Sequence, residues 1–349
     1  MQISVKQAKD FIVRCLMAGI TPMLSGHPGI GKSGIIKQIA EHYGWHVIDV
    51  RLSTFDPCDL NGFPKVGDNI AEFIPMDTFP LAGRDKIPDG CKGWLIFLDE
   101  FNSAPKAVEA AAYKLILDRM VGNHQLHSNA LVVAAGNLID SGAIVNRMGT
   151  ATQTRMAHLE LTVTPKEWIT WATASKVDHR IISYIHNRPD NLFQFDPKHD
   201  DKTFACPRTW EFASRLIQGV PNENLVNGEH VDDLNYLIPL LAGVVGESVA
   251  FDFVISTSIY SNIPSYQKIL VNPAGALVNE DPAALFAVSH LIAAFFEKKD
   301  VKPVLTYLER LPPEHQIITL QDILQKDPSV AKEPLINKMA IALGKDAFI

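Results

Sequence analysis

Cysteine and long apolar runs are both scarce in this sequence, and each absence narrows the class of protein. The four cysteines lie far apart among 349 residues and form no C-x-x-C pair, so we expect neither a disulfide framework nor a zinc site. The longest apolar stretches, residues 237–246 and 285–296, are far shorter than the roughly 20 residues that cross a bilayer. The N-terminal residues carry charges where a secretory signal would be apolar. We therefore expect a cytoplasmic protein that is not associated with a membrane.

A basic excess is missing as well. The chain has 32 Lys and Arg against 39 Asp and Glu, which gives a formal net charge of -7. Proteins that grip nucleic acid through its phosphates usually carry the opposite balance. Binding of nucleic acid is therefore the less favoured alternative, although a local basic pore stays open.

Within this ordinary composition, residues 26–33 read GHPGIGKS and match the pattern G-x-x-x-x-G-K-[ST]. In such a loop, backbone N–H groups surround phosphate oxygens, the lysine reaches the β- and γ-phosphates, and the hydroxyl binds Mg²⁺. An apolar run precedes the loop and apolar residues at helical spacing follow it, which predicts a strand, a loop and a helix. The predicted nucleotide-binding residues of this segment are Gly26, His27, Pro28, Gly29, Ile30, Gly31, Lys32, Ser33 and Gly34.

A second group of polar residues follows predicted strands. A continuous apolar strand ends in Asp99 and Glu100, and Asn137 ends the next strand. Asp99 has the position of a Walker B aspartate, so Ser33 and Asp99 are the predicted Mg²⁺ ligands, with Asp99 also counted among the nucleotide-binding residues. Glu100 is the predicted general base for an attacking water, and Asn137 could hydrogen-bond the γ-phosphate or that water. The set predicts phosphoryl transfer to water.

The order of strands and helices predicts an α/β fold with a five-stranded parallel sheet and a site at its carboxyl edge. Residues 3–18 and 103–120 are predicted to be helices, the second with Ser103 as its N-cap. Between them, residues 53–90 are rich in proline and glycine and predict an inserted surface hairpin that turns at Gly67, Asp68 and Asn69. The predicted strands are residues 21–26, 46–52, 93–102, 129–137 and 157–163.

Beyond residue 164 the patterns are helical with no convincing strand, which predicts a domain boundary there. Residues 234–254 read as a pair of buried helices broken at Gly243 or Gly246. We expect a nucleotide-binding core over residues 1–164, an α-helical region over 165–280 and a helical C-terminal extension over 281–349.

The order of these motifs along the chain resembles the MoxR-like, dynein-related branch of the AAA+ ATPases. The motifs are GHPGIGKS, LIFLDEFN, AAGN, two arginines in IVNRMGTATQTRMAHLEL, and CPRTWEF. The resemblance covers at least residues 20–215. It implies a P-loop core with an α-helical lid, and ATP and Mg²⁺ as cofactors. It also implies a sensor 1 role for Asn137 and a sensor 2 role for Arg208, at the start of a lid helix. In this family a neighbouring subunit supplies an arginine finger, for which Arg155 is the first candidate and Arg147 the second.

The resemblance further implies a homo-oligomeric ring, which we expect to be a hexamer. Such rings couple ATP hydrolysis to the remodelling or activation of a partner protein, often one with a von Willebrand factor A domain. Two alternatives stay open. A DNA-associated AAA+ motor, a translocase or a restriction-type machine, is disfavoured by the acidic balance. The other is a non-motor nucleotide switch or a small-molecule kinase, and a kinase would not need a set of residues that activates water.

Overall fold

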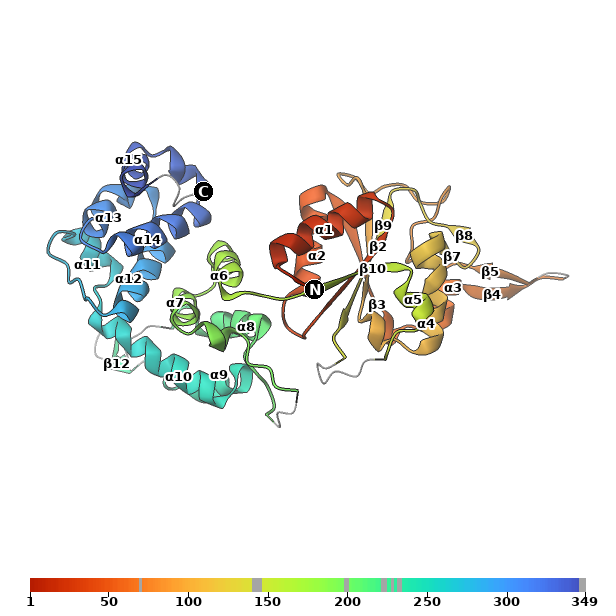
Figure 1. Ribbon diagram of the computed structural model, residues 1–349, viewed down its shortest axis with the longest axis horizontal. Coiled ribbons are helices and arrows are strands. Elements are labelled where there is room, and N and C mark those ends of the chain that lie inside the picture. The colour runs from red at the N-terminus through yellow and green to blue at the C-terminus, as the bar shows by residue number, and fades with distance from the viewer. Residues whose placement is uncertain are drawn as a thin grey trace. The chain divides into compact units, whose positions relative to one another are not determined.

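The structure is a computed structural model that describes residues 1–68, 71–139, 146–197, 201–220, 225–226, 229–230 and 234–344. The chain divides into two compact units, Met1–Val163 and Thr164–Ile349, which are described separately (Figure 1). In the described part of the chain, no helix combines the length and the apolarity that crossing a bilayer requires.

The first unit is built on a six-stranded sheet with the order β1-β10-β2-β9-β6-β3, in which every pair of neighbours is parallel. The prediction of an α/β fold with a parallel sheet is confirmed. The predicted count of five strands missed the edge strand β1, because its two residues are too few to show a period. The helix predicted for residues 3–18 starts too early, since α1 begins only after its N-cap Ser4. The strands are β1 Gln2–Ile3, β2 Thr21–Gly26, β3 Trp45–Arg51, β6 Gly93–Asp99, β9 Ala130–Asn137 and β10 Met156–Leu161.

Helices cover both faces of this sheet. Figure 1 shows α1 (Val5–Met17) and α2 (Lys32–Tyr43) on one face, and α4 (Lys106–Tyr113) on the other. Ile96 and Leu98 of β6 belong to the hydrophobic cluster that contains the buried residues of α4, while the equally buried Leu95 and Phe97 alternate with them. Because side chains alternate along a strand, the near-continuous apolar run of β6 buries both faces of the sheet.

The segment after β6 differs from the single helix predicted for residues 103–120. A 3-10 turn covers Phe101–Ser103, α4 follows, a π-helical turn covers Lys114–Asp118, and Met120–Val121 (β7) pairs with His124–Gln125 (β8). The predicted N-cap Ser103 is wrong because Ala104 and Pro105 are extended, with ψ of 149° and 146°. The residue before a proline avoids helical geometry, so the helix begins only after Pro105.

Residues 53–90 contain a short helix, α3 (Pro57–Asn61), and an antiparallel pair of strands, β4 (Phe63–Val66) and β5 (Ala71–Ile74). Figure 1 shows this pair extending away from the sheet of the first unit. Of the predicted turn, Asn69 lies outside the described residues. The last elements of the unit are a 3-10 turn at Leu52–Thr54 and α5 (Thr150–Gln153).

Where the structure describes the second unit, it is helical apart from one pair of two-residue strands, which the sequence did not predict. These strands are β11 (Leu225–Val226) and β12 (Glu229–His230). The predicted helix pair is broken at Gly246, which separates α9 from α10. The α-helices are α6 Pro165–Ala174, α7 His179–Asn187, α8 Pro207–Ile217, α9 Ile238–Val245, α10 Glu247–Thr257, α11 Tyr266–Val271, α12 Pro282–Phe295, α13 Val301–Leu308, α14 Pro313–Lys326 and α15 Pro334–Leu343. Short 3-10 turns lie at Pro189–Leu192, Ser258–Asn262, Lys298–Asp300 and Pro328–Lys332.

Two groups of side chains form the core of this unit. Trp210 of α8 is fully buried, donates its indole N–H to the carbonyl of Asn191, and packs against Tyr184 and Phe253. The other group is a hydrophobic cluster whose members run from Ile263 to Ile336. One apolar cluster therefore includes residues from both sides of residue 280, where the sequence suggested the start of an extension.

Candidate nucleotide-binding site

A glycine-rich loop joins β2 to α2. Gly29 and Gly31 have φ angles of 77° and 95°, a region that residues with side chains rarely adopt. Gly26 is required for a different reason, because a Cβ there would lie 2.5 Å from Ile30 Cδ1 and 3.2 Å from the carbonyl oxygen of Leu161. No side chain caps α2 at its N-cap, Gly31, so the first amide groups of the helix can receive an anion.

Lys32 is buried beside this loop, with 8% of its surface exposed. Its ammonium donates to the carbonyls of Gly26 and His27 at 2.8 and 2.9 Å, and to Asn137 Oδ1 at 2.9 Å. These bonds aim the ammonium across the loop toward the end of β9. A positive charge held at this place can neutralise the charge of a phosphate group.

Ser33 and Asp99 meet although they are distant in sequence. Ser33 Oγ donates a hydrogen bond of 3.0 Å to Asp99 Oδ2. The parallel sheet explains the meeting, since Asp99 ends β6, Asn137 ends β9, and Asn137 pairs in register with Gly26 at the end of β2. A hydroxyl and a carboxylate are hard oxygen donors of the kind that Mg²⁺ takes, so these two residues fit the predicted metal.

Glu100 follows Asp99 in a left-handed conformation, with φ of 55° and ψ of 35°. Its N–H donates to Asp99 Oδ1 at 2.9 Å, and its carboxylate accepts a hydrogen bond from Ser53 Oγ. Ser53 was not predicted as a site residue. The contact arises because β3, which precedes Ser53, lies next to β6 in the sheet, and no local motif carries that information.

Asn137 is also held by a residue that the sequence did not single out. Asn102 Nδ2 donates to the carbonyl of Asn137 at 2.6 Å, and the N–H of Asn137 donates to Asn102 Oδ1 at 3.1 Å. Asn102 is buried, with 4% of its surface exposed. The polar set at this sheet edge therefore includes Ser53 and Asn102 in addition to the predicted residues.

The two candidate finger arginines lie in the segment that leads to β10. The guanidinium of Arg155 lies over the ring of Tyr113, 5.1 Å from its centroid, and donates to the carbonyl of Ala151. Its Nε is buried and has no hydrogen-bond partner among the described residues. Arg147 is exposed, and its carbonyl accepts from Lys106 Nζ at 2.6 Å. These contacts join both arginines to residues between 106 and 151, outside the glycine-rich loop.

Arg208, the predicted sensor 2 residue, belongs to the second unit. It is the second residue of α8 and is exposed. The start of this helix is fixed by Thr209, whose hydroxyl accepts from the N–H of Cys206 at 2.8 Å. Arg208 is therefore presented from the first turn of a well-anchored helix.

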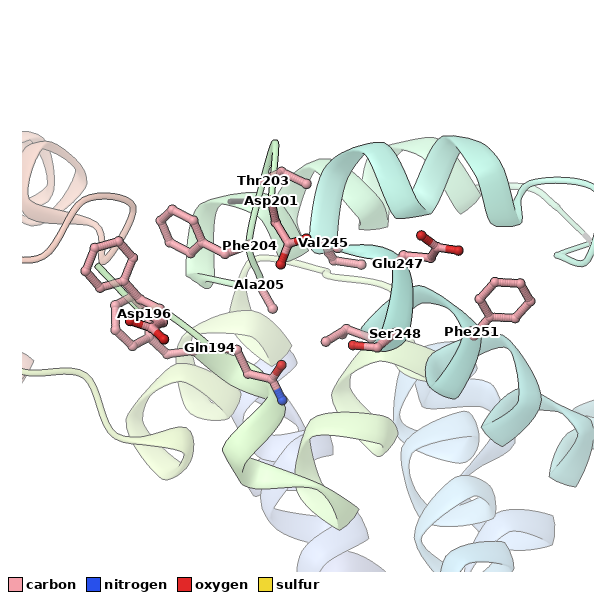
Figure 2. Close-up of a pocket in the computed structure, with 14 residues that line it drawn as sticks. Gln194, Asp196, Asp201, Thr203, Phe204, Ala205, Val245, Glu247, Ser248 and Phe251 are labelled. Atoms are coloured by element: carbon pink, nitrogen blue, oxygen red, sulfur yellow. The ribbon is translucent and has the colours of Figure 1, made fainter. Parts of the chain in front are cut away.

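The second unit also contains a cavity of about 850 Å³ between residues 193–205 and the start of α10 (Figure 2). Its lining combines phenylalanines such as Phe204 with the carboxylates of Asp196, Asp201 and Glu247. None of the predicted site residues lines it.

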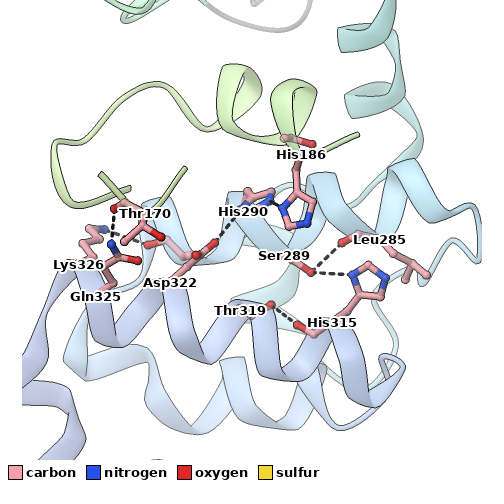
Figure 3. Close-up of polar contacts among 12 residues, drawn as sticks. Thr170, His186, Leu285, Ser289, His290, His315, Thr319, Asp322, Gln325 and Lys326 are labelled. Atoms are coloured by element: carbon pink, nitrogen blue, oxygen red, sulfur yellow. Dashed lines mark hydrogen bonds and ion pairs between the residues drawn. The ribbon is translucent and has the colours of Figure 1, made fainter. Parts of the chain in front are cut away.

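A buried polar network joins three helices of the second unit (Figure 3). His290 of α12 contacts Asp322 Oδ2 of α14 through Nδ1 at 2.7 Å, and His186 Nδ1 of α7 through Nε2 at 3.3 Å. Burial and the neighbouring His290 lower the pKa of His186 to about 4. His186 is therefore neutral at neutral pH, and the network serves to join the helices.

A protein family is similar to the part of the chain that contains the glycine-rich loop. Residues 22–153 match the family described as "ATPase family associated with various cellular activities (AAA)". This stretch, which is similar to the AAA family, carries Lys32, Asp99, Glu100 and Asn137. No curated protein matches the chain in sequence.

Among the solved structures that match the chain are NtrX and a RuvB mutant. NtrX from Brucella abortus has 12% identity and a TM-score of 0.38, over 99% of this chain and 69% of that one. A lysine-to-arginine mutant of RuvB from Thermotoga maritima has 15% identity and a TM-score of 0.38, over 78% of this chain and 75% of that one. At these values the likeness carries no argument about function.

Proposed function

We propose that this protein is a MoxR-like AAA+ ATPase that hydrolyses ATP with Mg²⁺. The proposal rests on two neighbouring hydrogen bonds, from Lys32 to Asn137 and from Ser33 to Asp99. Together they bring the glycine-rich loop, the start of α2 and the ends of two strands to one edge of the sheet. Lys32 neutralises phosphate charge, and Ser33 and Asp99 hold Mg²⁺. Bound Mg²⁺ would offset charge on the phosphate oxygens. Arg208 contacts the nucleotide from the lid.

Glu100 acts as the general base. Its carboxylate takes a proton from the attacking water, which Asn137 orients toward the phosphate. In the structure Oε2 of this carboxylate accepts from Ser53, so the attacking water competes with Ser53 for that oxygen. Ser53 is thereby a built-in competitor for the base.

The working form is a homo-oligomeric ring, which we expect to be a hexamer. Within the described residues of the first unit, Lys32 is the cation that hydrogen-bonds to the glycine-rich loop. A second cation from a neighbour, Arg155 or Arg147, would complete the site and is worth about 10³ to 10⁵ in rate where it occurs. An isolated subunit therefore binds ATP but turns it over slowly.

The energy of hydrolysis drives remodelling or activation of a partner protein in the cytoplasm, for example one with a von Willebrand factor A domain. Large apolar side chains on the extended pair β4 and β5 support a protein partner, since such groups gather at protein contacts. The surrounding segment is acidic, which disfavours DNA. The exposed residues are Phe63 at 53%, Val66 at 82%, Phe73 at 46% and Ile74 at 50%.

The test uses the full chain. Phosphate release with Mg²⁺ and ATP should occur in the wild type and be lost in Glu100→Gln, while Glu100→Gln still binds ATP. Ultracentrifugation with ATP should give a ring, and Glu100→Gln held in ATP should capture a protein partner of defined identity. Absence of turnover at any protein concentration would refute the ATPase proposal. Stimulation of turnover by DNA, without a response to the captured protein, would favour the DNA motor.

A further inference from the structure

Asn102 takes the place of a missing strand neighbour. β6 and β9 pair from Trp94 with Ala130 as far as Leu98 with Ala134, whereas β9 continues to Asn137. On its other side β9 stays paired with β2 up to Asn137. The side-chain amide of Asn102 bonds both the N–H and the carbonyl of Asn137, at 3.1 and 2.6 Å. It thus supplies the two hydrogen bonds that a neighbouring strand would give.

The strand is shaped to admit this side chain. A Cβ at Gly136 would lie 2.3 Å from Asn102 Oδ1 and 2.7 Å from Met23 Cε, far inside van der Waals contact. Gly136 therefore leaves the space in which Asn102 reaches the backbone of Asn137. Any larger residue at that position has to displace Asn102.

The position of Asn102 also joins it to the other parts of the site. It lies in the 3-10 turn that follows Glu100, where the N–H of Ser103 donates to the carbonyl of Glu100 at 2.9 Å. Its own carbonyl accepts from the N–H of Asn146 at 2.6 Å, in the segment that leads to the candidate finger arginines. Asn102 thus touches the base-bearing turn, the end of β9 and the start of that segment.

We propose that Asn102 is a positioning residue for hydrolysis. It holds the backbone of Asn137, and this keeps the side-chain amide oxygen of Asn137 on Lys32 Nζ, at the phosphate end of the site. The inference rests on the proposed ATPase function. Asn102 holds the backbone of Asn137, and the side chain of Asn137 accepts from Lys32, so Asn102 acts through Asn137. Its removal should loosen the orientation of Asn137 and leave the ATP-binding loop intact.

The experiment measures kcat, KM and the Kd for a fluorescent ATP analogue for Asn102→Ala, Asn137→Ala and the double variant. Ser103→Ala, in the same turn, is the matched control. We expect Asn102→Ala to lower kcat by about tenfold or more, with Kd changed by less than about threefold, as for loss of an oriented hydrogen-bonding group. In the Asn137→Ala background, Asn102→Ala should change kcat by less than about twofold, because residues that act as a unit are not additive.

Two further variants cover the case in which Asn102→Ala folds poorly. Asn102→Asp keeps the acceptor for the Asn137 N–H and loses the donor to its carbonyl, and Gly136→Ala displaces Asn102 without altering it. Both should lower kcat while Kd stays near the wild-type value. Because both changes disturb buried contacts, kcat is measured at a temperature well below the melting temperature of each variant. A wild-type kcat in these variants, with kcat reduced in Asn137→Ala, would overturn the role of Asn102 and leave the ATPase proposal standing. A full additional loss in the Asn137→Ala background would overturn it too. A wild type without turnover would instead refute the ATPase proposal itself.

Discussion

Ser53 Oγ donates a hydrogen bond to the carboxylate of Glu100, and so the proposed general base is occupied by a neighbour from the end of β3. The same glutamate has a left-handed backbone, with φ of 55°, which is uncommon for a residue with a side chain. The turn and the hydroxyl together fix where the carboxylate lies. If Glu100 is the base, we expect release from Ser53 to favour water activation.

Removal of the Ser53 hydroxyl should make the base easier to reach. We expect Ser53→Ala to raise basal kcat by about two- to twelvefold, since one net hydrogen bond is worth about 0.5 to 1.5 kcal/mol. KM should stay unchanged, because the loop is not altered. Thr54→Ala is the control, since Thr54 bonds the carbonyl of Arg51 instead. A lower kcat in steady-state phosphate release would mean that Ser53 orients the base and does not compete for it.

Lys32 should decide nucleotide binding. We expect Lys32→Ala to weaken ATP binding by about 10- to 100-fold, because a charge-assisted hydrogen bond is worth about 1.5 to 3 kcal/mol. Lys37→Ala is the matched control, since Lys37 lies on the same helix but forms a surface ion pair with Asp49 at 3.1 Å. Titration with a fluorescent ATP analogue measures both. Equal affinity in the two variants would show that Lys32 does not contact the phosphates.

The meeting of Lys32, Asp99 and Asn137 at one sheet edge could be predicted, because a local motif marks the loop and parallel strands end on the same side. Ser53 and Asn102 could not be predicted in this way. Their contacts depend on β3 lying next to β6 and on the left-handed turn at Glu100, which are properties of the folded sheet. The roles of the site residues stay predictions.

The departures in the fold have local causes as well. The apolar spacing of residues 103–120 indicates a helix, but extended Ala104 and Pro105 delay its start and a π-helical turn ends it. Helical periodicity reports the buried face and carries little information about such interruptions. The edge strand β1 pairs through only two residues, too few for any pattern to appear.

Glu109 should make the free energy of unfolding depend on pH in the acidic range. Its buried carboxylate pairs with Lys106 Nζ at 2.8 Å and accepts from Thr152 Oγ1 at 2.6 Å. Burial raises its pKa, but the hydrogen bonds from Lys106 and Thr152 and the charge of Lys106 outweigh burial, so the pKa is lowered from 4.5. Because the pKa of Glu109 is lower in the folded state, its stabilisation is complete when the pH is above the pKa of the unfolded state. The stabilisation is lost as the pH falls through the pKa of the folded state.

We therefore expect Glu109→Gln to lower the free energy of unfolding by about 2 kcal/mol at neutral pH, as for loss of hydrogen bonds to a charged group. The difference from wild type should shrink as pH falls below 4.5, the ordinary value for this carboxyl. Denaturant unfolding across pH 3 to 7, roughly the range in which a carboxyl titrates, measures it. Glu41→Gln, at an exposed position, is the control. A pH-independent difference would rule out the ionised carboxylate as the source.

Arg155 should act on the site of a neighbouring subunit. Within its own subunit it lies over Tyr113 and bonds Ala151, so its removal should leave ATP binding unchanged and lower kcat by about 10³-fold or more. Arg155→Ala and Glu100→Gln should each be nearly inactive, yet a mixture should recover turnover, because one supplies the base and the other the arginine. A mixture of Glu100→Gln with Asn137→Ala is the control. Each of these residues acts in its own subunit's site, so no site in the mixed ring holds both of them and no pairing restores turnover. If Glu100→Gln recovers turnover with Arg147→Ala but not with Arg155→Ala, the arginine finger is Arg147. If neither mixture recovers turnover, the result contradicts a finger supplied in trans.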